Sequence, residues 1–122
     1  MRFSQDLGSY ANVIRAYGAG ELRINDTLYG GAVIVSASTL VSEPDIRDLS
    51  QLLAIDPSRI LALDPELILL GTGPRQTFPP PGFGGQFLRA GIGVEVMDTG
   101  AACRTFNVLA ADQRRVVALL LV

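Results

Sequence analysis

The stretch of sequence that decides the fold reads VEVMDTGAACRTFN and runs from Val94 to Asn107. Its first four residues are mostly apolar and predict a short strand at 94–97. The residues from 100 to 111 predict an amphipathic helix, and Asp98 or Thr99 is placed to cap its first turn. A strand that leads directly into a helix indicates an α/β fold.

The alternation of helix and strand extends over the second half of the chain. The Asp56-Pro57 pair is typical of a helix start, with the aspartate as N-cap and the proline at the first helical position. The continuous apolar run at 67–70 is typical of a strand buried on both faces of a parallel sheet. From residue 56 the predicted order is a helix that stops before Pro65, a strand at 67–70, a helix at 83–90, a strand at 94–97, a helix at 100–111 and a strand at 116–122. This order predicts an α/β fold with a largely parallel sheet.

The first third of the chain has a different pattern, which indicates antiparallel β structure. Residues 20–24 alternate between polar and apolar and predict a half-buried strand. Asn25-Asp26 then turns the chain toward a second short strand at 27–29. An apolar, β-branched run predicts a third strand at 32–36. Residues 1–10 are expected to form a flexible terminus.

Length, charge and hydropathy limit the class of protein. The 122 residues fit one domain, residues 1–122, and the formal net charge is −2. No run of Lys or Arg is present that would follow a phosphate backbone, so we expect no nucleic-acid binding. The longest apolar run, residues 116–122, is too short to cross a bilayer, and no apolar signal core begins the sequence. With a single cysteine and no internal disulfide, these features predict a cytoplasmic protein.

The composition also limits the chemistry. The chain has no His and no Lys, which removes the commonest general base, the commonest metal ligand and the amine of Schiff-base mechanisms. Cys103 would lie in the first turn of a helix, where the dipole and Arg104 lower a thiol pKa, but no His is available as its base. A free cysteine is more often a small buried hydrophobe. We therefore expect no enzymatic activity, no metal and no cofactor.

Two groups of residues are candidates for a binding site. Gly71-Thr72-Gly73 follows the buried strand and lies at the carboxyl edge of the sheet, where α/β proteins usually bind ligands, and Arg75 adds a charge. In the helix at 100–111, Cys103 and Asn107 are four residues apart and therefore neighbours on one flank. If the two groups face each other, they form a cleft for an anion or another small molecule. The candidate binding residues are Gly71, Thr72, Gly73, Arg75, Asp98, Thr99, Cys103, Arg104 and Asn107.

A purely structural interpretation explains the same residues. The two glycines let the chain turn sharply off a buried strand. Asp98 and Thr99 cap the helix, Cys103 fills a small space, and Asn107 bonds to backbone groups. The helical phase places one apolar face against the sheet, made of Ala102, Thr105, Phe106 and Leu109.

Several of these motifs together resemble a known family. The stretches concerned are 67–73, 91–92, 95–99, 101–109 and 115–118. In this order and spacing, the chain from Gly20 onward resembles a small family of domains of unknown function that includes the mitochondrial respiratory complex I assembly factor 3. The resemblance implies a three-layer fold: a mixed central sheet flanked by helices, with an additional N-terminal antiparallel β layer. It supplies no catalytic residues, because none is established for the family.

The leading functional hypothesis is a non-enzymatic protein-interaction or assembly-factor module. The resemblance implies that its partner is another protein, such as a member of a membrane-associated complex. The Pro- and Gly-rich loop at 75–82, with Phe78 and the following Phe83, is a candidate for apolar contacts with that partner. The second hypothesis is the cleft for a small molecule or anion between Gly71–Arg75 and Asp98–Asn107.

Overall fold

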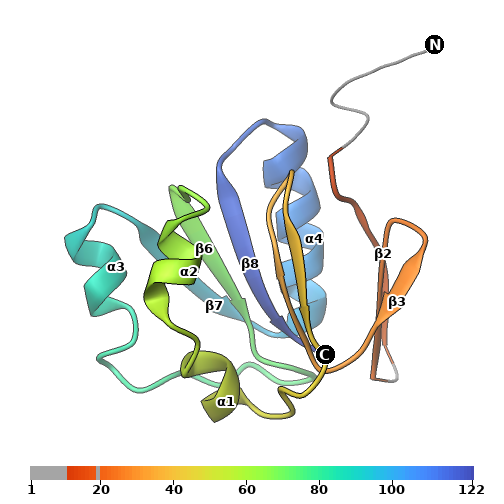
Figure 1. Ribbon diagram of the computed structural model, residues 1–122, viewed down its shortest axis with the longest axis horizontal. Coiled ribbons are helices and arrows are strands. Elements are labelled where there is room, and N and C mark those ends of the chain that lie inside the picture. The colour runs from red at the N-terminus through yellow and green to blue at the C-terminus, as the bar shows by residue number, and fades with distance from the viewer. Residues whose placement is uncertain (1–10, 19) are drawn as a thin grey trace.

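The computed structural model describes residues 11–18 and 20–122, and the flexible terminus expected at residues 1–10 lies outside them. Within the described residues the fold is mixed α/β, with two sheets and four helices (Figure 1). The strands are β1 (Ile14–Gly18), β2 (Glu21–Ile24), β3 (Thr27–Tyr29), β4 (Ala32–Val35), β5 (Leu40–Glu43), β6 (Leu67–Gly71), β7 (Gly93–Met97) and β8 (Val116–Leu121). The helices are α1 (Leu49–Leu53), α2 (Pro57–Leu61), α3 (Gly85–Arg89) and α4 (Thr99–Ala111).

The five-stranded sheet is mixed and has the order β5-β4-β8-β6-β7. β6 pairs in parallel with β7 and β8, so Leu69 has Glu95 on one side and Ala118 on the other. β4 pairs antiparallel with β5 and β8. The sheet thus has two parallel and two antiparallel pairings. It is less parallel than the sequence predicts. The reason is that β4 and β5 form antiparallel pairings in this sheet and do not pair with the antiparallel strands β1, β2 and β3.

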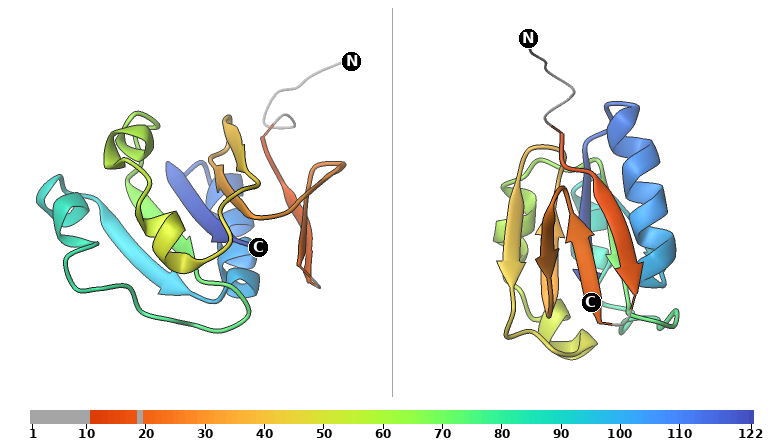
Figure 2. Two further views of the ribbon diagram at one scale, coloured as in Figure 1. Left: turned by 60° about the horizontal axis from the view of Figure 1, so that its bottom comes forward. Right: turned by 90° about the vertical axis from the view of Figure 1, so that its right-hand side faces the viewer.

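The side chains of the central strands alternate between two apolar cores, one on each face of this sheet. In β6, Leu69 packs in the core that contains Phe106 of α4 and residues of the three-stranded sheet β1-β2-β3. Ile68 and Leu70 pack instead in the core that contains Phe87 of α3 and residues of α1 and α2. Helix α4 and the three-stranded sheet therefore cover one face, while α1, α2 and α3 cover the other (Figures 1 and 2).

Helix α4 forms as its sequence predicts. The Oδ1 of Asp98 accepts a hydrogen bond from the backbone N–H of Ala101 at 2.8 Å, which confirms Asp98 as the N-cap. Ala102 and Phe106 are fully buried and Arg104 is exposed, in agreement with the helical phase. The polar residues of the stretch from Val94 to Asn107 that follow Asp98 thus lie on a helix whose orientation is fixed by the packing of Ala102 and Phe106 in the core.

Three short elements have no counterpart in the prediction from sequence: β1, β5 and α1. In β1 the register against β2 shifts between Ile14 and Ala16, which leaves Arg15 as the extra residue of a bulge. A bulge interrupts the two-residue period by which a strand is recognised. Helix α1 has only five residues, too few for a helical period to emerge.

Candidate functional site

Thr99 joins the two candidate groups of residues directly. Its backbone N–H donates to the carbonyl oxygen of Gly73 at 2.8 Å, and its Oγ1 accepts from the backbone N–H of Gly73 at 2.7 Å. The same hydroxyl donates to the carbonyl oxygen of Leu121 in β8 at 2.7 Å. Because Thr99 is fully buried, these hydrogen bonds tie the loop after β6 to the start of α4 and to the end of β8.

Gly71 allows this close approach. A Cβ atom at Gly71 would lie 3.0 Å from the Oγ1 of Thr99 and 3.0 Å from the Cδ2 of Leu120, so a larger residue would displace the start of α4. The loop after β6 and the start of α4 are therefore packed against each other at this contact. The cleft expected between these segments is closed there, and the small size of Gly71 serves the packing of the protein.

Thr72 and Arg75 lie in the same turn after β6. The Oγ1 of Thr72 donates to the carbonyl oxygen of Arg75 at 2.6 Å and accepts from the backbone N–H of Thr77 at 3.0 Å. Thr72 is buried, whereas Arg75 is exposed. The hydroxyl of Thr72 therefore holds the loop in shape and is occupied by protein groups.

A pocket of about 150 Å³ lies between β1 and α4, and we call it the β1–α4 pocket. It brings together three of the candidate residues, Cys103, Arg104 and Asn107, and none of those that follow β6. Its lining consists of Ile14, Arg15, Ala16, Tyr17, Gly100, Cys103, Arg104 and Asn107. Sequence reasoning missed Arg15 and Tyr17, because the bulged strand that carries them gives no periodic signal.

The carboxamide of Asn107 holds β1 against α4. Its Oδ1 accepts from the backbone N–H of Ile14 at 2.9 Å, and its Nδ2 donates to the carbonyl oxygen of the same residue at 2.8 Å. The side chain thereby takes the place of a neighbouring strand at the edge of the three-stranded sheet. The interpretation of Asn107 as a partner of backbone groups is confirmed.

Comparison with known proteins assigns the chain to a family. Residues 14–121 match the family described as "Protein of unknown function (DUF498/DUF598)". The chain belongs to the DUF498/DUF598 family. A 13 kDa major membrane protein of Francisella tularensis is 32% identical over 108 residues, which cover 88% of each chain. The NADH dehydrogenase (ubiquinone) 1 alpha subcomplex assembly factor 3 of Danio rerio is 29% identical over 124 residues, which cover 96% of this chain and 68% of that protein. The resemblance recognised from the motifs is therefore confirmed.

Solved structures share the fold of this DUF498/DUF598 domain. A protein from Bordetella parapertussis has a TM-score of 0.82 and 34% sequence identity, with coverage of 91% of this chain and 95% of that chain. An outer membrane protein from Bartonella henselae has a TM-score of 0.76 and 33% identity, with coverage of 91% and 94%. In the present structure, no helix within residues 11–18 and 20–122 combines the length and the apolar character needed to cross a membrane.

The thiol of Cys103 is buried inside the DUF498/DUF598 domain, with 6% of the residue exposed. Burial raises the pKa of this thiol to about 11, and the neighbouring Arg104 only partly offsets that rise. A thiol with such a pKa is protonated at neutral pH and is a poor nucleophile. The position of Cys103 in the first part of α4 therefore does not activate it.

Alkylation of Cys103 is expected to be much slower in the folded protein than in the unfolded chain. At pH 8 the thiolate fraction falls by about a hundredfold when the pKa rises from 9.0 to about 11. Iodoacetamide labelling followed by mass spectrometry, with and without urea, measures the two rates. Equal rates would contradict the burial of the thiol.

The same pKa shift has a consequence for stability at high pH. Between about pH 9 and pH 11 the folded state keeps the Cys103 proton that the unfolded chain releases. The contribution of the Cys103 thiol to the free energy of unfolding is therefore fully present below pH 9 and is lost as the pH rises through about 11.

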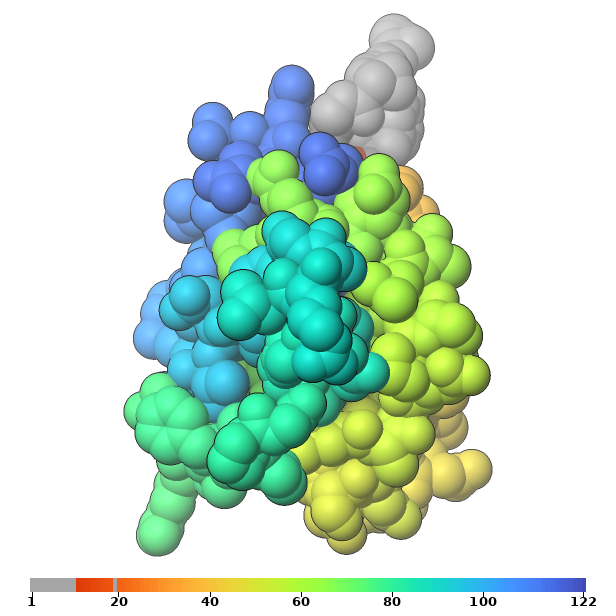
Figure 3. Space-filling view, turned by 90° about the vertical axis from the view of Figure 1, so that its left-hand side faces the viewer, coloured from red at the N-terminus to blue at the C-terminus, as the bar shows by residue number. Residues whose placement is uncertain are grey.

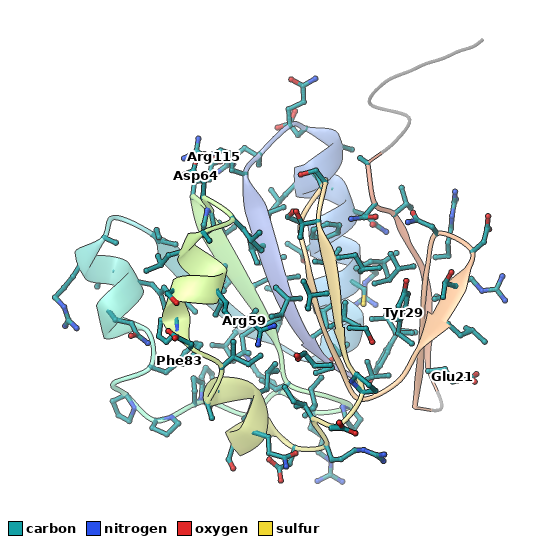
Figure 4. The ribbon with its side chains drawn as sticks, viewed as in Figure 1. Glu21, Tyr29, Arg59, Asp64, Phe83 and Arg115 are labelled. Atoms are coloured by element: carbon teal, nitrogen blue, oxygen red, sulfur yellow. The ribbon has the colours of Figure 1, made fainter. Side chains whose placement is uncertain are left out.

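Arg114 and Arg115 form ion pairs with two acidic residues at the amino ends of β6 and β8. The Nε of Arg114 contacts the Oε1 of Glu66. The Nε of Arg115 lies 3.5 Å from the Oδ2 of Asp64, and Figure 4 labels these two residues. Hydrogen bonding to Arg114 lowers the pKa of Glu66. Among the residues that the structure describes, no group of three or more His, Cys, Asp or Glu is placed to hold a metal ion. All four charged side chains are substantially exposed, so these pairs contribute little to stability.

Proposed function

We propose that this member of the DUF498/DUF598 family is a non-enzymatic module that binds another protein during the assembly of a complex, and that it acts in the cytoplasm. The Danio rerio relative is named as an assembly factor, and its match covers 96% of this chain. Two other similar proteins are named as a membrane protein and an outer membrane protein. These names support a partner that belongs to a membrane-associated complex.

The observation that carries this proposal is an exposed apolar surface around α3. Phe78 is 73% exposed and Leu88 is 72% exposed. A pocket of about 310 Å³ adjoins Leu88. We use the name α3 surface for the exposed Phe78, which lies in the loop before α3, together with the pocket residues Pro81, Gly84, Gly85, Leu88, Ile92 and Val94. Figure 3 looks onto the side of the molecule where α3 and the loop before it lie. Apolar side chains with this exposure are typical of contact sites.

Only one of the two aromatic residues expected to face a partner is free to do so. Phe83 packs edge-on against Phe87, with ring centroids 5.6 Å apart and an angle of 64° between the planes. Because Phe87 is fully buried, Phe83 anchors the loop to the core. Phe78 remains as the aromatic side chain that a partner can cover.

Strand β7 adds backbone groups to the α3 surface because it is an edge strand. The carbonyl oxygen of Val96 in β7 accepts from the Nε2 of Gln76 at 2.9 Å, so the loop occupies one backbone group of this strand. An edge strand beside an apolar pocket is suited to pair with an extended segment of another protein. Leu88 and Phe78 would then supply apolar contacts beside that pairing.

A variant with both Phe78→Ser and Leu88→Ser is expected to lose its protein partner. Removing two exposed apolar anchors should weaken binding by tenfold or more, on the order of the loss at interface hot spots. The melting temperature should stay close to that of the wild type, because neither side chain belongs to a core. Quantitative affinity capture from cells of the source organism, followed by mass spectrometry, measures the loss.

The matched control for this experiment is Val108→Ser. Val108 is 68% exposed but lies on α4, on the other face of the five-stranded sheet. Its substitution should leave capture unchanged. The proposal fails if the wild-type protein recovers no partner in stoichiometric amount, or if Val108→Ser reduces capture as much as the double variant.

Three features support the non-enzymatic part of the proposal. The chain has neither His nor Lys, the raised pKa keeps Cys103 protonated, and protein groups already occupy the hydroxyl of Thr99. The proposal also keeps the three-layer arrangement that the resemblance implies. Its layers would be the group α1–α3, the five-stranded sheet, and α4 together with the three-stranded sheet.

A further inference from the structure

We infer that the β1–α4 pocket binds a single phosphate group between the guanidinium groups of Arg15 and Arg104. The pocket lies between β1 and α4, on the opposite face of the five-stranded sheet from α3. The inference therefore stands apart from the proposed protein partner at the α3 surface, and each can fail without the other.

Two arginines, Arg15 and Arg104, line this pocket, and no carboxylate among the described residues belongs to its lining. Arg15 comes from the bulge of β1 and Arg104 from α4, and both line the same 150 Å³. Within residues 11–18 and 20–122, the ion pairs of the structure are made by other arginines. Two guanidinium groups that share a small pocket repel each other, and an anion between them converts this repulsion into two attractive contacts.

The acidic group that acts on the pocket is the carboxyl of Asp98. Its charge contributes to the raised pKa values of Tyr17 and Cys103, after the larger effect of burial. Its Oδ1, however, accepts the hydrogen bond from Ala101 that caps α4. Asp98 therefore belongs to the helix start and does not pair with either arginine at ion-pair distance.

The other polar side chains of the lining carry no charge at neutral pH, since burial raises the pKa values of Tyr17 and Cys103. Gly100 lies in the first turn of the 13-residue helix α4, where backbone N–H groups have no partner within the helix. The protonated, buried thiol of Cys103 is a weak donor. The carboxamide of Asn107 already bonds to both backbone groups of Ile14 and carries no charge. A lining of this kind favours an anion over a cation or a neutral ligand.

The size of the pocket and the chemistry of its two arginines indicate which anion. A volume of about 150 Å³ is smaller than the pockets that enclose whole metabolites, so it suits one terminal group. Guanidinium groups pair in a bidentate manner with phosphate oxygens, and a phosphate monoester offers enough oxygens for two of them. The ligand is thus free phosphate or the terminal phosphate of a larger molecule.

The first test is a titration with inorganic phosphate at pH 7 and constant ionic strength, with sodium chloride as the compensating salt. NMR shifts of the backbone amides report the binding, and we expect saturable shifts at Tyr17, Gly100 and Cys103. Arg15→Gln and Arg104→Gln should each weaken binding by about tenfold or more, because each removes a charge-assisted contact.

Two exposed arginines outside the pocket provide the matched controls. Arg75→Gln and Arg89→Gln remove the same charge from the loop after β6 and from α3, and they should leave the affinity for phosphate unchanged. If Arg75→Gln weakens binding as much as Arg104→Gln does, the attraction is non-specific and the inference is overturned.

Gly100→Ala tests the pocket without any change of charge. A Cβ at Gly100 would lie 3.6 Å from the Nη1 of Arg104 and 3.7 Å from the Cδ2 of Tyr17, which are ordinary contact distances. The Oδ1 of Asp98 would lie 3.3 Å from the same Cβ, so this oxygen has to shift by only a few tenths of an ångström. We expect the methyl group to weaken phosphate binding severalfold while the melting temperature is maintained, since alanine also favours the helix.

A second arm distinguishes the two sources of a phosphate group. Vesicles of phosphatidylcholine with and without phosphatidic acid present the same phosphate monoester on a lipid. Binding to the vesicles with phosphatidic acid that Arg104→Gln abolishes, without any response to free phosphate, assigns the phosphate to a lipid head group and supports the inference. No response to free phosphate or to either kind of vesicle overturns it.

Discussion

Replacement of Thr99 by valine is expected to lower the free energy of unfolding by about 2–6 kcal/mol. Valine has nearly the same shape as threonine but forms no hydrogen bonds through its side chain. The backbone N–H of Gly73 and the carbonyl oxygen of Leu121 each lose their bond to the Thr99 hydroxyl. Each buried group left without a partner costs about 1–3 kcal/mol. Urea-induced unfolding followed by circular dichroism measures the difference.

Thr105→Val is the matched control, because it makes the same substitution on the same helix. The Oγ1 of Thr105 donates to the carbonyl oxygen of Ala101 at 2.9 Å, one turn earlier in α4. This bond is local and joins no other element, so its loss should change the stability by less than about 1 kcal/mol. Similar stabilities for Thr99→Val and the wild type would show that Thr99 does not join the three segments.

Replacement of Asn107 by leucine is expected to destabilise the protein by about 2–3 kcal/mol and to loosen the three-stranded sheet. The backbone N–H and carbonyl oxygen of Ile14 both lose their partner on α4. Leu22 and Ile24 of β2 are buried against the core that contains Phe106, and this contact depends on the position of the small sheet. Hydrogen exchange at the amides of β1 and β2 should therefore accelerate more than exchange in β6 and β8.

Val108→Leu controls for the introduction of a leucine into α4. Val108 is adjacent to Asn107 in sequence but is exposed, and leucine favours a helix slightly more than valine does. We expect no loss of stability and no change in hydrogen exchange. A uniform acceleration in all strands of Asn107→Leu would indicate global unfolding, and the role of Asn107 as a local clamp would be refuted.

The parts of the fold that follow from local patterns were predictable from the sequence. The carboxylate of Asp98 caps α4 because it is adjacent to the helix, and Phe106 is buried because the helical period fixes its direction. The apolar run that forms β6 is buried on both faces, as its composition indicates. Pairings between distant segments were not predictable in this way. The antiparallel pairing of β4 with β8 joins residues 32–35 to residues 118–121, and no local feature of β4 specifies it.

The candidate site shows the same division. Cys103, Arg104 and Asn107 are close together on one helix, so their grouping was visible in the sequence. The segment that faces these residues, β1, was not visible in the sequence. Its residue Ile14 lies 93 residues before its partner Asn107, and the bulge of β1 hides the strand pattern. Thr99 illustrates a second difficulty. A buried hydroxyl that bonds to distant backbone has the same sequence signature as a helix cap or a ligand-binding residue.

The position of β8 in the middle of the five-stranded sheet has a consequence for how the protein is made. β8 comprises residues 116–121 and lies between β4 and β6, and its side chains enter both apolar cores. Before the ribosome has translated residues 116–121, β4 and β6 lack the strand β8 that lies between them and pairs with both. Neither core can then close, and folding must follow synthesis of this segment instead of accompanying it. Until β8 has been synthesised, the nascent chain therefore exposes unpaired strand edges, which are prone to aggregation.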